Sequence, residues 1–271
     1  MSLRSALLSV LKSSLIIGSL GVTHSLAAAS PVQYIPSAAN TPGLYGAYYK
    51  TRLFIRENNG NGGIILVLSA ATPGGLLTTT LTFAGDYYSD NVLDDLFHYT
   101  GGAAISVGVN PGDNSTFVMR AEVYTDGPFG EMTTPLPLLT LDSAVTTPDP
   151  ATYPTLNVAV GLGSAANSRI NIGCSNFSSD PATVVASVYG SHGWGGTQTL
   201  SLAPGQWSQF ALEPEPALPY SKASTAYFYG KGTSPAAPIF CYAVKVSNSS
   251  NDGTLIPAVP NTPVNIPIAG V

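Results

Sequence analysis

The chain carries one strand pattern twice, and this repeat restricts its fold more than any other feature. Alternate apolar residues follow Arg52 in TRLFIREN and, about 117 residues later, follow Arg169 in SRINIGCSN. At this offset Glu57 aligns with Cys174. Solenoid repeats are shorter, about 20–50 residues, so this repeat predicts two related domains. The runs that then recur in the same order are IILVLS with TVVASVY, TLTFAGD with TLSLAPGQ, AISV with AYFY, FVMRAEVYTD with IFCYAVKVSN, and GPFGEMTTPLPLL with NDGTLIPAV.

Both halves consist of short runs of alternating apolar residues separated by turn-forming residues. The composition agrees, with 28 Gly, 22 Pro and only 9% charged residues. Alternation places one face of each sheet in a core and the other in solvent. The sequence therefore predicts an all-β chain of two tandem Ig-like antiparallel β-sandwich domains. Their predicted bounds are 30–141 and 155–260, with a proline-rich linker at 142–154 and an apolar tail at 261–271.

One segment, SDNVLDDLFHY, has helical rather than strand spacing. Ser89 or Asp90 is expected to cap a single helical turn. Four apolar side chains would then cover the edge of the sandwich: Val92, Leu93, Leu96 and Phe97.

The first 29 residues have the three parts of a secretory signal peptide. Arg4 and Lys12 supply positive charge, 15–22 is apolar, and small alanines follow at 27–29. The apolar run is shorter than the roughly 20 residues that span a membrane. The sequence therefore predicts a signal peptide at 1–29, a secreted or cell-surface protein, and no membrane span in the mature chain.

The charge of the chain argues against nucleic acid as a partner. Without Arg4 and Lys12 the 10 basic residues become 8, against 15 acidic residues, so the predicted mature chain has a net charge of −7. No basic run remains to neutralise phosphates.

The two cysteines, Cys174 and Cys241, lie in expected strands of the second half. A disulfide between them would close a loop of about 67 residues and stabilise the fold by roughly 3–4 kcal/mol. The alternative is two buried thiols packed as small apolar side chains. A metal site is less favoured, because no histidine lies near either cysteine in the sequence. We favour the disulfide.

The order YIPSAANTPGLYGAYYKTRLFIREN, NVLDDLFHYTGGAAISV and MRAEVYTDGPFGEM resembles a cassette of secreted bacterial proteins. The second half, from INIGCSNFSSDPATVVASVYG to NDGTLIPA, is similar to the unit that follows it. The resemblance covers most of 34–259 and implies tandem Ig-like sandwiches outside the cytoplasm. The cassette has no established activity, so it implies no site residues. Glu57 and Cys174 depart from its pattern, which has apolar or small residues there.

Catalytic candidates are few, because only His98 and His192 remain after the signal peptide. Ser191 and His192, in GSHGWGG, are the local pair that a serine hydrolase would need. That segment lacks the G-x-S-x-G elbow, and a glycine-rich hairpin loop is the favoured interpretation. Glu213 and Glu215 are a carboxylate pair of the kind glycosidases use, but flanking prolines favour an exposed loop.

The one local acidic cluster consists of Asp86, Asp90, Asp94 and Asp95, and the first three are the candidate ligands for calcium. Their spacing matches no standard calcium loop. Capping of the helical turn is the alternative role for them.

Aromatic residues near predicted loops and strand ends are the candidates for ligand binding, because exposed rings stack on sugars and anchor protein partners. The alternative is that they pack on loop backbone and strand ends. The candidates are Tyr45, Tyr48, Tyr87, Tyr88, Trp194 and Trp207.

These observations predict a secreted, non-enzymatic structural, adhesive or glycan-binding protein of the cell surface or matrix. Low charge favours association with itself, as oligomers or filaments, through sheet faces or edges. The apolar tail can add as a strand to a neighbour, and glycans or surface proteins are the other expected partners. The alternative is a secreted esterase or glycosidase whose site lies between the domains or near 190–196.

Overall fold

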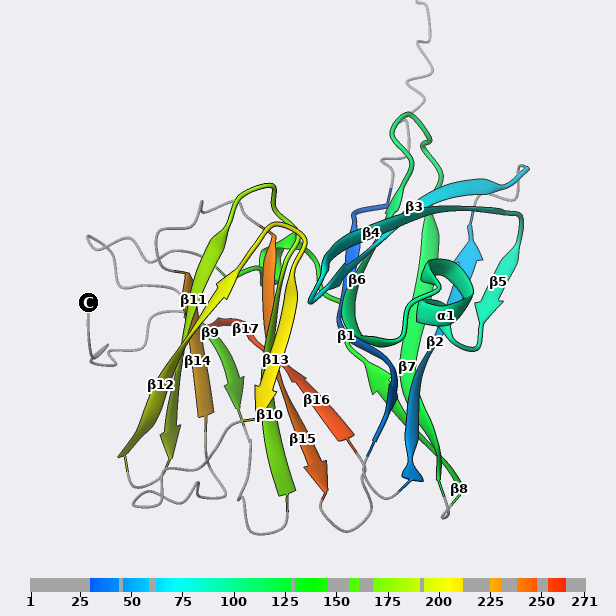
Figure 1. The fold of residues 1–271 in the computed structure, drawn as a ribbon. Helices are drawn as coiled ribbons and strands as arrows, with labels where there is room; N and C mark the ends of the chain where they lie inside the picture. The colour runs from blue at the N-terminus through cyan, green and yellow to red at the C-terminus, as the bar shows by residue number, and fades with distance from the viewer. Residues whose placement is uncertain are drawn as a thin grey trace, which may run out of the picture.

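The computed structural model describes residues 30–43, 46–58, 62–127, 130–145, 156–160, 168–190, 193–211, 225–230, 238–247 and 253–261. The fold is all-β with antiparallel sheets and one short α-helix (Figure 1). We call 30–145 the first half and 156–261 the second half. The predicted signal peptide lies outside the described residues, as do most of the linker and the tail.

The first half is a sandwich-like sheet of eight strands in the order β4-β3-β6-β1-β2-β7-β8, with β5 also paired to β2. Strand β1 joins the two layers, because its first part pairs with β6 and its last residues pair with β2. A register shift between Ile35 and Ala38 lies within the pairing with β6, and such irregularities bend a strand. The strands are β1 (Gln33–Pro42), β2 (Tyr48–Glu57), β3 (Ile64–Thr72), β4 (Gly75–Phe83), β5 (Asp86–Ser89), β6 (Gly101–Val109), β7 (Phe117–Gly127) and β8 (Gly130–Leu136).

The second half has two sheets, β13-β10-β15-β16 and β12-β11-β14-β9-β17. Side chains such as Ile172, Val184 and Phe228 fill the core between them and are fully buried. The strands are β9 (Leu156–Val160), β10 (Ser168–Asn176), β11 (Ala182–Gly190), β12 (Gly193–Leu202), β13 (Trp207–Ala211), β14 (Thr225–Gly230), β15 (Ile239–Ser247), β16 (Gly253–Pro257) and β17 (Val259–Asn261).

The strand order of the first half recurs in the second. The layer β4-β3-β6-β1 corresponds to β12-β11-β14-β9, and the pairings β5-β2-β7-β8 correspond to β13-β10-β15-β16. In both halves the chain then returns to the first strand of that half. Leu139 forms a bridge with Tyr34 of β1, and β17 pairs with β9. This agrees with the sequence repeat. The Ig-like identity and the domain bounds stay predictions.

The pairing corrects the sequence alignment of the opening strands by two residues. Glu57 pairs with the first residue of β7, and Asn176 pairs with the first residue of β15. The N–H of Glu57 donates to the carbonyl of Gly85 (2.9 Å), as that of Asn176 donates to Gln206 (2.8 Å). Glu57 therefore corresponds to Asn176, and aligning it with Cys174 was wrong. A shift of two residues leaves an alternating pattern unchanged, so apolar spacing alone cannot detect it.

The expected helical turn is present as α1 (Val92–Phe97). Val92 and Leu93 are fully buried, and the side chains of residues 96 and 97 pack on the first core. The N-cap is Asn91, so the expected cap at Ser89 or Asp90 was wrong. Instead, Asp95 accepts hydrogen bonds from the Ser89 hydroxyl (2.7 Å) and the Asn91 N–H (3.3 Å). Within the described part of the chain, no helix has the length and apolar character needed to cross a membrane.

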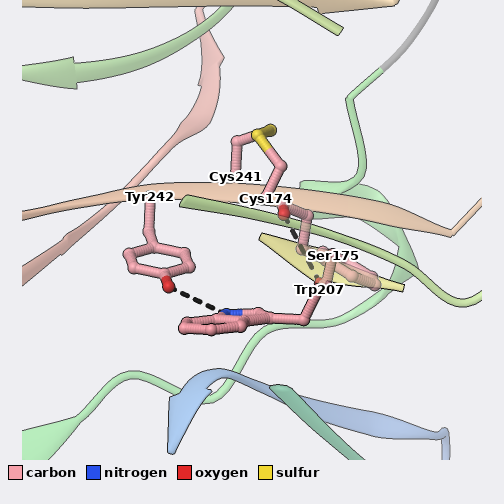
Figure 2. Close-up of a disulfide and its surroundings, with 6 residues drawn as sticks. Cys174, Ser175, Trp207, Cys241 and Tyr242 are labelled. Atoms are coloured by element: carbon pink, nitrogen blue, oxygen red, sulfur yellow. Dashed lines mark hydrogen bonds between the residues drawn. A yellow bond between two sulfur atoms is a disulfide. The ribbon is translucent and has the colours of Figure 1, made fainter. Parts of the chain in front are cut away.

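The predicted disulfide between Cys174 and Cys241 is confirmed (Figure 2). The two cysteines pair directly across β10 and β15, and both side chains are fully buried in the second core. The bond therefore lies within one sheet. In antibody domains the conserved disulfide joins the two sheets instead.

The two halves pack against each other through the sheet β13-β10-β15-β16, which lies between the first half and the rest of the second half (Figure 1). Phe240 of β15 contacts Tyr34 of β1, with ring centroids 4.2 Å apart, and Phe177 packs on the same pair. Leu255 of β16 packs against the first core. Strand β15 is consequently buried on both faces over most of its length, and the halves share one packed interface.

Candidate functional site

The predicted catalytic residues are not brought together in the described structure. Ser191 and His192 lie outside the described residues, as do Glu213 and Glu215. His98 is exposed immediately after α1, with a left-handed backbone (φ 50°). Among the described residues, no serine or carboxylate side chain hydrogen-bonds its ring.

The three candidate calcium ligands take part in separate interactions. Asp86 pairs with Arg56 at 3.5 Å, and both side chains are exposed. Asp90 is bound by Arg52 at 2.9 Å, whereas Asp94 is exposed in α1. In the described ranges, no three His, Cys, Asp or Glu side chains are grouped so as to hold a metal ion. Calcium binding therefore stays a prediction with no site among these residues.

Arg52 is the centre of a charged cluster on the outer face of β2. Its Nε donates to Asp90 Oδ1 (2.9 Å), and its two terminal nitrogens donate to the carboxylate of Glu131, with Nη2 to Oε2 at 2.9 Å. Its guanidinium also lies 3.6 Å from the centroid of the Tyr124 ring. Tyr88 and Tyr124 both donate hydroxyl hydrogen bonds to Asp90, at 2.7 and 2.6 Å. We call these five residues the Arg52 network.

The electrostatics of the Arg52 network favour a structural role over a role in proton transfer. The hydrogen bond from Tyr124, then that from Tyr88, lowers the pKa of Asp90 to about 2. The hydrogen bond to Glu131 raises the pKa of Arg52 further above its ordinary value, and the same bond lowers that of Glu131. Acid–base catalysis needs a group with a pKa near the working pH. These shifts move the network away from that condition.

Replacing Asp90 with asparagine is expected to destabilise the fold by up to about 1 kcal/mol at pH 7, a small effect because its side chain is half exposed. The folded-state pKa of Asp90, about 2, is below its ordinary value of 3.8. Its stabilisation is therefore present above pH 3.8 and lost as the pH falls through 2. Urea unfolding of wild type and Asp90→Asn at pH 7 and pH 2.5 measures this, with Asp94→Asn as the control. An equal deficit at both pH values would contradict the electrostatic origin.

The candidate aromatic residues are spread over several elements rather than gathered on one face. Tyr48 donates to the Asn40 side chain (3.0 Å), and Tyr87 packs half-buried against the first core. Tyr88 is 53% exposed and belongs to the Arg52 network. Trp194 lies in β12, where it pairs with Tyr189; its side chain, like all of Tyr45, lies outside the described residues. Their ligand-binding role stays a prediction.

Trp207 lies in the interface between the halves (Figure 2). Its indole N–H donates to the hydroxyl of Tyr242 (2.9 Å), which in turn donates to Gln209 Oε1 (2.9 Å). Burial raises the pKa of the fully buried Tyr242 well above its ordinary value. The Trp207 ring also covers Gly102 of β6, where any Cβ would collide with it. These contacts account for the position of Trp207 without a ligand.

Sequence reasoning missed Phe240 and Tyr242 as interface residues. Both lie in IFCYAVKVSN, in which the residues on both strand faces are apolar or aromatic. A continuous apolar run of this kind indicates a strand buried on both faces. The sequence therefore contained this signal, but it did not show which element covers the second face of the strand.

Charge is absent from one layer of the first half and from one sheet of the second half. The strands of β4-β3-β6-β1 and β12-β11-β14-β9-β17 contain no Asp, Glu, Lys or Arg. Every charged residue of the described strands lies in β2, β5, β7, β8, β10 or β15. We call these two layers the charge-free sheets. Their outermost strands, β4 and β12, each pair on one side only within the described structure.

A pocket of about 270 Å³ lies between the halves, where the predicted alternative placed a hydrolase site. Its described lining contains no histidine, cysteine or carboxylate. The described lining includes Ser37 but none of the groups that hydrolases of the expected types use as general base. The chain matches no protein-family model, no curated protein and no solved structure.

Proposed function

We propose that this protein is a secreted, non-enzymatic structural component that assembles with copies of itself through the free edges of its charge-free sheets. The observation that carries the proposal is the segregation of charge. Natural proteins protect the edges of sheets with charged residues, especially lysine, with proline or with bulges. The charge-free sheets have two outer strands on which such charges are missing.

Strand β4 is the better of the two edges for pairing. Its sequence, GLLTTTLTF, has nine residues, no charge and no proline, and its pairing with β3 runs from Gly75 to Phe83 without a register shift. Thr78, Thr80 and Thr82 are exposed on its outer face. Threonine and leucine on an uncharged edge with a regular register are compatible with addition of another strand.

Strand β12 provides a second uncharged edge, although its pairing with β11 shifts register between Val188 and Tyr189. Thr197, Thr199 and Ser201 are exposed there, next to β11. A two-fold pairing of β4 with β4 gives a closed dimer. A second two-fold pairing of β12 with β12 joins those dimers into an open chain. Two different self-complementary edges on one molecule therefore produce filaments.

The other edges of the described sheets differ from β4 and β12 in length, proline content or charge: β13 has only five residues, β16 contains Pro257, and β17 contains Pro260. Strand β8 carries Glu131, and the short strand β5 carries Asp86. Charges at these edges oppose unplanned pairing. The molecule thus has protected and unprotected edges on different sheets, which directs association to the charge-free ones. The non-enzymatic part of the proposal is supported by the Arg52 network, whose pKa shifts do not suit catalysis.

The test compares lysine substitutions on different edges of the chain 30–271. Thr80→Lys in β4 and Thr199→Lys in β12 place like charges beside one another in each two-fold pairing, which destabilises it. We expect wild type to form filaments or large oligomers by electron microscopy and light scattering. Each single variant should stop at a small closed assembly, and the double variant should be monomeric.

The matched control is Thr133→Lys, on an exposed threonine of the edge strand β8. It should assemble like wild type, and thermal unfolding should show that all the variants are folded. A monodisperse wild-type monomer at all concentrations would overturn the proposal. Equal inhibition by Thr133→Lys would overturn the assignment to these edges.

A further inference from the structure

We propose that the pocket between the halves binds a small molecule with an apolar body and a carboxylate head. This inference is independent of self-assembly, because the pocket lies away from the outer strands β4 and β12 and shares no lining residue with them. It rests on the walls of the pocket, an unpartnered hydroxyl and the charge of the lining.

The walls are apolar and come from both halves. Val123, Met132 and Leu136 contribute from β7 and β8. Val244, Val246 and Leu255 contribute from β15 and β16. The volume of about 270 Å³ is near the lower limit of ligand sites in proteins. It therefore suits a short alkyl or single-ring compound rather than a large cofactor.

A buried hydroxyl in the lining lacks a partner in the described structure. Thr125 is 3% exposed, and no described group hydrogen-bonds its Oγ1. Buried polar atoms nearly always have a partner, so one without a partner calls for an explanation. Because Thr125 lines the pocket, an oxygen of a bound ligand would complete its hydrogen bonding.

The charge of the lining selects the head group. Arg169 of β10 is the one residue with a formal charge among the lining residues, and its five N–H donors allow it to bind a ligand oxygen in addition to its contacts within the protein. A guanidinium matches the geometry of a carboxylate with paired hydrogen bonds. An anionic oxygen group is therefore favoured over an amine. Pro42 at the rim is exposed, and Thr41 and Tyr49 beside it are half-buried, which leaves an entry side.

The test uses decanoate, decanol and decylamine below their aggregation limits, with the chain 30–271 and isothermal titration calorimetry. We expect decanoate to bind one per chain, decanol to bind at least 10-fold more weakly, and decylamine not to bind. Arg169→Gln should weaken decanoate binding at least 10-fold. Thr125→Val should weaken it several-fold without lowering the thermal unfolding midpoint, because it removes the unpartnered hydroxyl and keeps the shape.

The control variant is Arg120→Gln, an exposed arginine on the outer face of β7, which should leave decanoate binding unchanged. Leu255→Trp, which fills the pocket, should abolish binding of both decanoate and decanol. Equal affinity for the three probes, or decanoate binding that Arg169→Gln does not change, would overturn the proposal. Light scattering on the same samples reports assembly separately, so failure of one proposal is distinguishable from failure of the other.

Discussion

Replacing both Cys174 and Cys241 with alanine is expected to lower the free energy of unfolding by about 4 kcal/mol. The disulfide joins residues 67 positions apart. Without it the unfolded chain gains the conformational freedom of that loop, which accounts for most of the expected loss. The change is large beside the 5–15 kcal/mol that typically separates folded and unfolded domains. Urea unfolding under non-reducing conditions measures it.

The reductant supplies the control for this measurement. Wild type unfolded with dithiothreitol present should lose a similar amount of stability, whereas the double alanine variant should not respond to dithiothreitol. Thiol titration of unfolded wild type should find no free thiol, in agreement with the absence of free cysteines among the described residues. A double variant as stable as wild type would contradict the loop-entropy argument.

Phe240→Ala is expected to cost about 3–5 kcal/mol, the range found when a large buried aromatic is truncated. Phe240 is fully buried, and its ring packs against Tyr34 of the first half. The cavity would therefore form at the interface rather than inside one core. The matched control is Phe54→Ala, which removes a half-exposed ring on the outer face of β2 and should cost about 1 kcal/mol or less.

The position of Phe240 predicts how the variant unfolds as well as how much stability it loses. Because the interface joins both halves, the variant should unfold at a lower urea concentration by circular dichroism and by limited proteolysis of either half. If only fragments of the second half become sensitive to protease, the interface does not couple the halves in the way their packing indicates.

The repeated strand order could be predicted from the sequence because alternation and turn residues are local signals. The helical turn at α1 and the cysteine pair followed from equally local evidence. The register could not be predicted, because Glu57 keeps its place in an alternating pattern whether it is aligned with Cys174 or with Asn176. The two positions were distinguished by backbone hydrogen bonds to Gly85 and Gln206, which lie far from them in the chain.

The candidate site shows the same limit more strongly. Asp86, Asp90 and Asp94 are near one another in the sequence, yet Asp86 pairs with Arg56, Asp90 binds Arg52, and Asp94 is exposed in α1. Asp90 meets Arg52 across 38 positions, and Arg52 meets Glu131 across 79. Which side chains converge depends on the pairing of β2 with its neighbours. Proximity in the sequence therefore identified Asp90 as a candidate residue, but it could not indicate that Arg52, Tyr88 and Tyr124 bind it.

The charge-free sheets could be predicted only in part from the sequence. Low overall charge was evident from composition, but its segregation depends on which strands share a sheet. For example, β3 and β4 are adjacent in the sequence, whereas β1 joins their layer through β6. Strand order had to be known before the uncharged strands could be seen to form continuous layers.

Leu255 links the core of the first half to the last part of the described chain. It belongs to β16, near the end of the described chain, yet it packs against the core of the first half. The chain is synthesised from its N-terminus. The core of the first half therefore lacks its contact with Leu255 until a residue more than 100 positions after its last strand, β8, has been made. Until then its apolar surface stays open to chaperones and proteases. The two halves are therefore expected to mature together, late and in one step, rather than one after the other.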